Sequence, residues 1–182
     1  MQMQNIKKLS FSAVICALAV VAVLAVHFPI FAVAAPFLEY DPGDIFVLVA
    51  GLLLGPWWGL DITLVASLVQ GVTVSAASGL YGILMHIIST GTLVLVATFV
   101  KRLFKSRLSS ELSVACGVLA ATAVMLGANM VITPAFMGVS VEAVRDMLLD
   151  GRFGASGSRI VINGILACAL YRAVRVPLSR LL

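Results

Sequence analysis

Polar and ionisable side chains lie within or beside long apolar segments of this chain, where each needs a hydrogen-bond partner or a polar ligand. These candidate residues are Glu39, Tyr40, Asp41, Asp44, Gln70, Tyr81, His86, Asn129, Arg159 and Asn163. Their carboxylate, amide, phenol, imidazole and guanidinium groups can together recognise a small hydrogen-bonding molecule. Because polar groups inside a membrane are costly and commonly functional, the set predicts a substrate-binding site.

Motifs that would indicate an enzyme are weak. The Gly-Ala-Ser-Gly sequence at 154–157 matches the Gly-x-Ser-Gly of intramembrane serine proteases, but no histidine follows Ser156 to act as its base. The sequence has no phosphate-binding Gly-x-x-x-x-Gly-Lys-Ser/Thr loop, so we expect no ATP hydrolysis by this chain. Neither the three cysteines nor His86 has further metal ligands at a suitable spacing in the sequence, so we also expect no metal site.

The composition indicates a membrane protein. Hydrophobic residues make up 62% of the 182 positions and charged residues 11%, with a mean hydropathy of +1.13. The apolar runs are 9–28, 44–54, 57–76, 80–100, 113–136 and 159–176. Most approach the ~20 residues that cross a bilayer as a helix, although the second is only half that length. We predict an all-α membrane protein in which six transmembrane helices form one domain over residues 1–182.

The positive charges predict the orientation. With a cytoplasmic N-terminus, the outer loops hold Arg145, Arg152 and Arg159. The inner set is Lys7, Lys8, Lys101, Arg102, Lys105, Arg107, Arg172, Arg175 and Arg180. This excess places both termini in the cytoplasm and explains the pI near 9.3 without a nucleic-acid partner. The alternative is a signal peptide cleaved after residue 34, which would leave five spans, so we favour a retained first helix.

Several candidate residues also have ordinary structural roles. Asp41 before Pro42 is a good helix N-cap, and Asp44 would sit favourably at the positive end of the same helix. His86 could form a structural bond between helices instead of contacting a ligand. Residues 140–149 predict a short amphipathic helix on the outer surface, suited to be a lid. Since the polar residues gather in the outer halves of the spans, we predict a ligand pocket near the outer face and closed below.

Three stretches resemble a known family. They are Ala13-x-x-x-Ala17, the run Phe-Leu-Glu-Tyr-Asp-Pro-Gly-Asp-Ile at 37–45, and the Gly-Pro-Trp-Trp-Gly turn at 55–59. The chain resembles the S components, the substrate-binding membrane subunits of energy-coupling factor (ECF) vitamin transporters. It is most similar to the riboflavin-type branch, whose members carry a Phe-Leu-x-Tyr-Asp-x-x-Asp run and a Gly-Pro-x-x-Gly turn.

The resemblance implies a function. It implies a vitamin bound from outside, no other cofactor, and a location in the bacterial plasma membrane. It also implies docking through Ala13 and Ala17 onto a membrane coupling subunit that two ATPase subunits drive. Asp41 and Asp44 match the acidic pair of the riboflavin-type branch.

The match to the riboflavin-type branch is incomplete. Gln70 stands where its members usually have Lys, Met-His at 85–86 stands in place of part of an Ala-Asn-Phe run, and Asn163 lacks the usual following Lys. Riboflavin or a related flavin is the first choice of ligand. The alternative is pantothenate or another acid vitamin, because Arg159 and His86 suit a carboxylate. A ligand-free membrane scaffold is the remaining alternative.

Overall fold

Each of the six predicted apolar runs forms a helix in the computed structural model, which describes residues 2–26, 29–31, 35–39, 41–74, 76–104, 109–149 and 154–179. These helices are α1 (Gln2–Ala25), α2 (Gly43–Leu54), α3 (Pro56–Val72), α4 (Gly79–Leu103), α5 (Ser109–Met137) and α7 (Gly154–Ser179). The expected surface helix at 140–149 is α6 (Val141–Leu149), and Ala76–Ser78 form a single 3-10 turn, η1. The prediction of a helical membrane protein is confirmed.

The helices differ in length. Ile6–Ala25, Gly79–Leu103 and Ser110–Met137 are long and apolar enough to cross a membrane, whereas Gly43–Leu54 and Val161–Val174 are shorter apolar helices. A 12-residue helix such as α2 is only about 18 Å long, so both of its ends lie well inside a bilayer-sized bundle. Its terminal backbone groups therefore need partners from within the protein.

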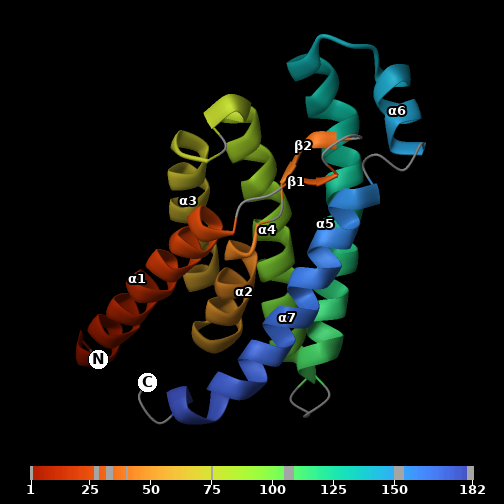
Figure 1. Cartoon of the computed structure of the whole chain (residues 1–182). Coiled ribbons are helices and arrows are strands. Elements are labelled where there is room, and N and C mark those ends of the chain that lie inside the picture. Colours follow the sequence, from red (N-terminus) through yellow and green to blue (C-terminus); the bar gives the residue numbers. More distant parts are fainter. Residues whose placement is uncertain are drawn as a thin grey trace.

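A two-stranded hairpin follows α1 and was not predicted. Strand β1 (Pro29–Phe31) pairs antiparallel with β2 (Ala35–Glu39), with Phe31 opposite Ala35. The hairpin, η1 and α6 lie toward one end of the bundle, here called the hairpin end (Figure 1). The start of α1, the end of α7 and the α2–α3 turn lie toward the opposite end, here called the terminal end (Figure 1).

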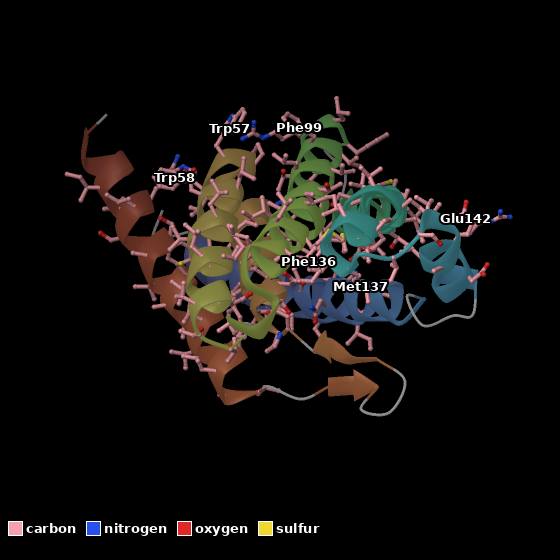
Figure 2. All side chains as sticks on the ribbon, turned by 90° about the horizontal axis from the view of Figure 1, so that it is seen from above. Trp57, Trp58, Phe99, Phe136, Met137 and Glu142 are labelled. Atoms are coloured by element: carbon pink, nitrogen blue, oxygen red, sulfur yellow. The ribbon has the colours of Figure 1, made fainter. Side chains whose placement is uncertain are left out.

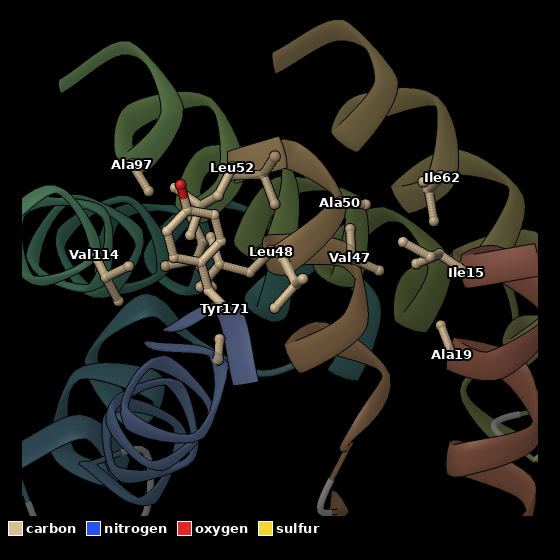
Figure 3. Packing of buried hydrophobic residues seen from close by; sticks show 14 of the residues in the cluster. Ile15, Ala19, Val47, Leu48, Ala50, Leu52, Ile62, Ala97, Val114 and Tyr171 are labelled. Atoms are coloured by element: carbon tan, nitrogen blue, oxygen red, sulfur yellow. The ribbon is translucent and has the colours of Figure 1, made fainter. Parts of the chain in front are cut away.

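The centre of the bundle is α2. Its buried Val47, Leu48 and Ala50 belong to the same core as Ile15 and Ala19 of α1 (Figure 3). The core continues across α4, α5 and α7 through Leu93, Val94, Ala97, Val114, Ala121, Ala167 and Tyr171. Viewed from above, α1 lies on one flank and α6 on the other, with Glu142 on the outward side of α6 (Figure 2). Helix α2 is thus surrounded by its neighbours, and its first turn faces the hairpin end.

The turn between α2 and α3 needs glycine. Gly55 has φ +117°, a conformation that residues with a side chain rarely adopt. Past the turn, a Cβ on Gly59 would lie 2.9 Å from Gly51 Cα and 2.4 Å from Val94 Cγ1. Gly51 and Gly59 thus let the backbones of α2 and α3 approach closely, with the Val94 side chain of α4 packed against both.

Candidate ligand-binding site

The first turn of α2 carries the two predicted acidic residues into the protein interior. Helix α2 begins at Gly43, one residue later than the sequence suggested, and Gly43 N–H donates to Asp41 Oδ1 at 2.8 Å. Asp41 is 6% exposed and Asp44 is 1% exposed. The expected capping role of Asp41 is therefore present, but it uses only one of the four carboxylate oxygens gathered here.

His86 on α4 lies between these two carboxylates. Its Nδ1 is 3.2 Å from Asp41 Oδ2, and its Nε2 is 3.7 Å from Asp44 Oδ1. One turn further along α4, the Thr90 hydroxyl donates to Asp44 Oδ1 at 2.5 Å and lies 3.4 Å from His86 Nε2. Both ring nitrogens thus face acceptors, so the imidazole links Asp41, just before α2, with Asp44 in the first turn of α2.

Two amides complete the group from α3 and α7. Gln70 Nε2 lies 3.4 Å from Asp41 Oδ1. Asn163 is fully buried, and its Nδ2 donates to the main-chain oxygen of Asp41 at 2.6 Å and to Asp44 Oδ2 at 3.3 Å. We call the following six residues the aspartate–histidine cluster: Asp41, Asp44, Gln70, His86, Thr90 and Asn163. Four helices therefore converge on one polar site.

Each of the four carboxylate oxygens of the cluster faces at least one donor group. The exception in the cluster, among the described residues, is the buried Asn163 Oδ1, which has no hydrogen-bond partner. A buried charge or acceptor in this state is costly unless a donor or a cation meets it. The arrangement is suited to a ligand that brings hydrogen-bond donors or positive charge.

The family comparison agrees with this architecture. Residues 7–178 match the family model described as "ECF transporter, substrate-specific component". The chain belongs to that family. A solved structure titled "Structure and mechanism of the S component of a bacterial ECF transporter" superposes with a TM-score of 0.75 at 21% identity, covering 98% of each chain. No curated protein matches. The chain is thus an S component, a multi-pass protein of the bacterial plasma membrane.

Two other predicted residues of this S component form a separate polar group. The Tyr81 hydroxyl lies 2.8 Å from Thr133 Oγ1, and Thr133 donates to Asn129 Oδ1 at 2.9 Å. Asn129 Nδ2 in turn donates to the main-chain oxygen of Met125. The Tyr81 ring stacks on Phe136 with the ring centroids 4.2 Å apart. The Tyr81–Thr133 bond thus bridges α4 and α5, and the described bonds of Asn129 lie within α5.

The remaining predictions have different outcomes. Glu39 lies in β2 and Arg159 in α7, but the placement of their side chains lies outside the described part of the chain, as does Tyr40 entirely. Thr90 was not among the predicted site residues. Its signal in the sequence was its position four residues after His86, on the same face of the helix.

One argument from the sequence is wrong. It held that His86 has no further metal ligands near it, whereas Asp41, Asp44 and His86 each offer a ligand atom, and these atoms all lie within 4.8 Å of one another. The ligands were missed because the two carboxylates come from α2, more than forty residues earlier in the chain.

The terminal end of α2 has a contrasting arrangement. Lys101 on α4 donates to the main-chain oxygen of Leu52 and to the Tyr171 hydroxyl. Its ammonium also lies 4.1 Å from the centroid of the Tyr171 ring, and Leu52 and Tyr171 adjoin in the core (Figure 3). We call Leu52, Lys101 and Tyr171 the lysine cluster. Beside it, a cavity of about 170 Å³ is lined by residues 51–55, Thr98, Lys101 and Arg102.

Proposed function

We propose that this S component is the high-affinity vitamin-binding subunit of an ECF-type importer, with riboflavin or a related flavin as its ligand. The observation that carries the proposal is the convergence of α2, α3, α4 and α7 on the buried aspartate–histidine cluster. Asn163 Oδ1 is a buried acceptor there without a partner among the described residues, and a donor-bearing ligand would satisfy it.

The direction of transport follows from the charges. Nine of the twelve basic residues lie on the side that the sequence assigns to the cytoplasm, and we propose six spans with both termini there. The aspartate–histidine cluster would then lie toward the outer side, from which a scarce micronutrient is captured. The hairpin and α6, at the same end of the bundle, would close over the ligand.

The charge of the cluster favours a flavin over a carboxylated vitamin. Arg159 and His86 were the groups expected to attract a carboxylate; the side chain of Arg159 lies outside the described part of the chain, and two aspartates flank His86. A carboxylate on the ligand would meet like charge from these aspartates in a poorly solvated site, which disfavours pantothenate. A flavin offers a ring imide N–H and several hydroxyl donors on its side chain and needs no cationic partner.

Energy for transport would come from partner subunits, since the sequence has no nucleotide-binding loop. Ala13 and Ala17 are exposed, four residues apart, on one face of α1. We propose that this small-residue face docks onto the membrane coupling subunit, to which two ATPase subunits attach. Close approach of helices through small residues is a common mode of association in lipid.

Thermal stabilisation of the purified protein tests the binding role. A ligand that binds only the native state raises the melting temperature. At a ligand concentration of one hundred times its Kd, the free energy of unfolding increases by about 2.7 kcal/mol. We expect a shift with riboflavin from a panel of B vitamins, and a yellow preparation if flavin copurifies. A shift with pantothenate alone would change the ligand assignment. No shift with any vitamin would favour the ligand-free scaffold.

The docking role has its own experiment. Ala13→Trp should abolish vitamin uptake in cells that hold the complete importer, because the indole would block the coupling subunit. Binding of the vitamin by the purified variant should be unchanged. The matched control is Leu18→Trp, an equally bulky change at another exposed position of α1, which should retain uptake. Loss of binding together with uptake in Ala13→Trp would instead mean that this face supports the fold.

A further inference from the structure

Helix α3 presents one carboxylate on an otherwise apolar exposed face. Its exposed residues recur at helical spacing along one side of the helix, and we call them the α3 stripe: Trp57, Asp61, Leu64, Val65, Leu68 and Val72. Exposed apolar side chains on a membrane protein lie against lipid or against another membrane helix. An acidic residue in such surroundings is costly unless a positive group meets it, so Asp61 indicates a partner.

The carboxylate of Asp61 has no charged or hydrogen-bonding partner among the described residues. Asp61 is five residues past Pro56, the first residue of α3, and so lies beyond the turn where a carboxylate caps a helix or meets its dipole. Lys101 and Arg102, the basic residues in the last turn of α4 at the same end of the bundle, do not pair with it. The counter-charge is therefore to be sought outside this part of the chain.

The depth of Asp61 in the membrane follows from Trp57. This tryptophan lies one turn earlier on the α3 stripe, nearer the terminal end, and an exposed tryptophan commonly marks the membrane–water interface. Four residues of helix rise about 6 Å, so Asp61 lies that much deeper. A lysine or arginine at this depth could extend its long stem back to the interface, but the single methylene of aspartate is too short. A cation supplied at the same depth would remove the cost of the unpaired carboxylate.

We propose that Asp61 forms an ion pair with a lysine or arginine on a membrane helix of the coupling subunit. The inference rests on the proposed function, in which Ala13 and Ala17 of α1 dock onto that subunit. Helix α1 packs mainly against α2 and α3. Since α2 is enclosed by its neighbours, the α3 stripe is the exposed helix face next to α1 (Figure 1). Small residues bring the helices close, and the charge pair selects the correct partner.

The test uses the tagged full-length chain, co-expressed with the coupling subunit and both ATPase subunits, and measures how much coupling subunit copurifies. Asp61→Asn should reduce the recovery by about tenfold or more, because the cation of the partner would be left unpaired in the interface. Asp61→Glu keeps the charge and should retain most of the complex. The matched control is Glu142→Gln, which neutralises an exposed carboxylate on the outward side of α6 and should leave assembly unchanged (Figure 2).

A second measurement uses the purified chain without its partners. Because Asp61 has no partner within the described part of the chain, Asp61→Asn should leave the melting temperature unchanged or raise it. Vitamin binding should be unchanged as well, since the aspartate–histidine cluster is intact. A lower melting temperature of Asp61→Asn would show that the carboxylate supports the fold, and it would overturn the ion pair.

Two further outcomes overturn the ion pair. One is equal recovery of the coupling subunit with Asp61→Asn and the unchanged chain. The other is a loss of assembly that occurs in bilayers containing phosphatidylethanolamine and not in bilayers without amino lipids, which would assign the cation to a lipid headgroup. If Ala13→Trp prevents assembly while Asp61→Asn does not, only the ion pair fails, whereas assembly of both variants also defeats docking through α1.

Discussion

The two ends of α2 lie in contrasting surroundings. At its first turn, Asp41 and Asp44 face His86, two amides and a hydroxyl from three other helices. At its last turn, the Leu52 carbonyl accepts from Lys101, which also contacts Tyr171. Both arrangements match the helix dipole, with acid at the amino end and base at the carboxyl end.

The two ends of α2 differ in the number of polar groups gathered around them. A single lysine with two acceptors and an aromatic face is an economical way to satisfy a buried helix terminus. At the amino end one oxygen of Asp41 accepts from Gly43 N–H, and two buried carboxylates and a largely buried imidazole are gathered there. We propose that these groups at the hairpin end bind the ligand and that the lysine cluster at the terminal end stabilises the fold.

The largest expected effect is at the amino end. Asp44→Asn keeps the size of the side chain but removes its charge, and charge-assisted hydrogen bonds contribute about 1.5–3 kcal/mol. We expect the Kd for the vitamin to rise by about 100-fold, which corresponds to roughly 2.7 kcal/mol. Isothermal titration with the purified variant measures it, and circular dichroism checks that the helical content is retained. An unchanged Kd would show that the acidic pair serves the fold alone.

The complementary change is at the carboxyl end. Lys101→Met keeps the length of the side chain but leaves the Leu52 carbonyl and the Tyr171 hydroxyl without this donor, at a cost of about 1–3 kcal/mol. We expect a melting temperature lower by several degrees and an unchanged Kd for the vitamin. Thermal melts and titration on the same preparation separate the two effects. If Lys101→Met weakens vitamin binding as much as Asp44→Asn, the division between the two ends is wrong.

Much of the fold was predictable because hydrophobic periodicity and length determine helices in a membrane. The six apolar runs and the amphipathic segment at 140–149 were all recognised. The hairpin at 29–39 was missed because its strands are three and five residues long and Pro29 and Pro36 disfavour a strand reading. Its pairing is a tertiary property with little local signal.

Most residues of the aspartate–histidine cluster could be picked out from the sequence, but not which of them lie together. The acidic pair, Gln70, His86 and Asn163 were identified because isolated polar residues in apolar runs are conspicuous. Tyr81 and Asn129 form a separate polar group because of the rotation of α4 and α5 about their axes. A single sequence does not specify that rotation. For the same reason the approach of His86 to two carboxylates of α2 was overlooked.

The smallest expected effect concerns the separation of the Tyr81–Thr133 bond from the aspartate–histidine cluster. Tyr81→Phe removes the hydroxyl that contacts Thr133 but keeps the ring that stacks on Phe136. Hydrogen bonds between membrane helices contribute about 0.6 kcal/mol on average, so the melting temperature should fall only slightly. The Kd for the vitamin should rise by less than about fivefold, or roughly 1 kcal/mol. Removing a bond between helices does not by itself weaken recognition of a ligand bound elsewhere. A tenfold or greater loss of affinity would therefore place Tyr81 and Thr133 in the ligand site beside the aspartate–histidine cluster.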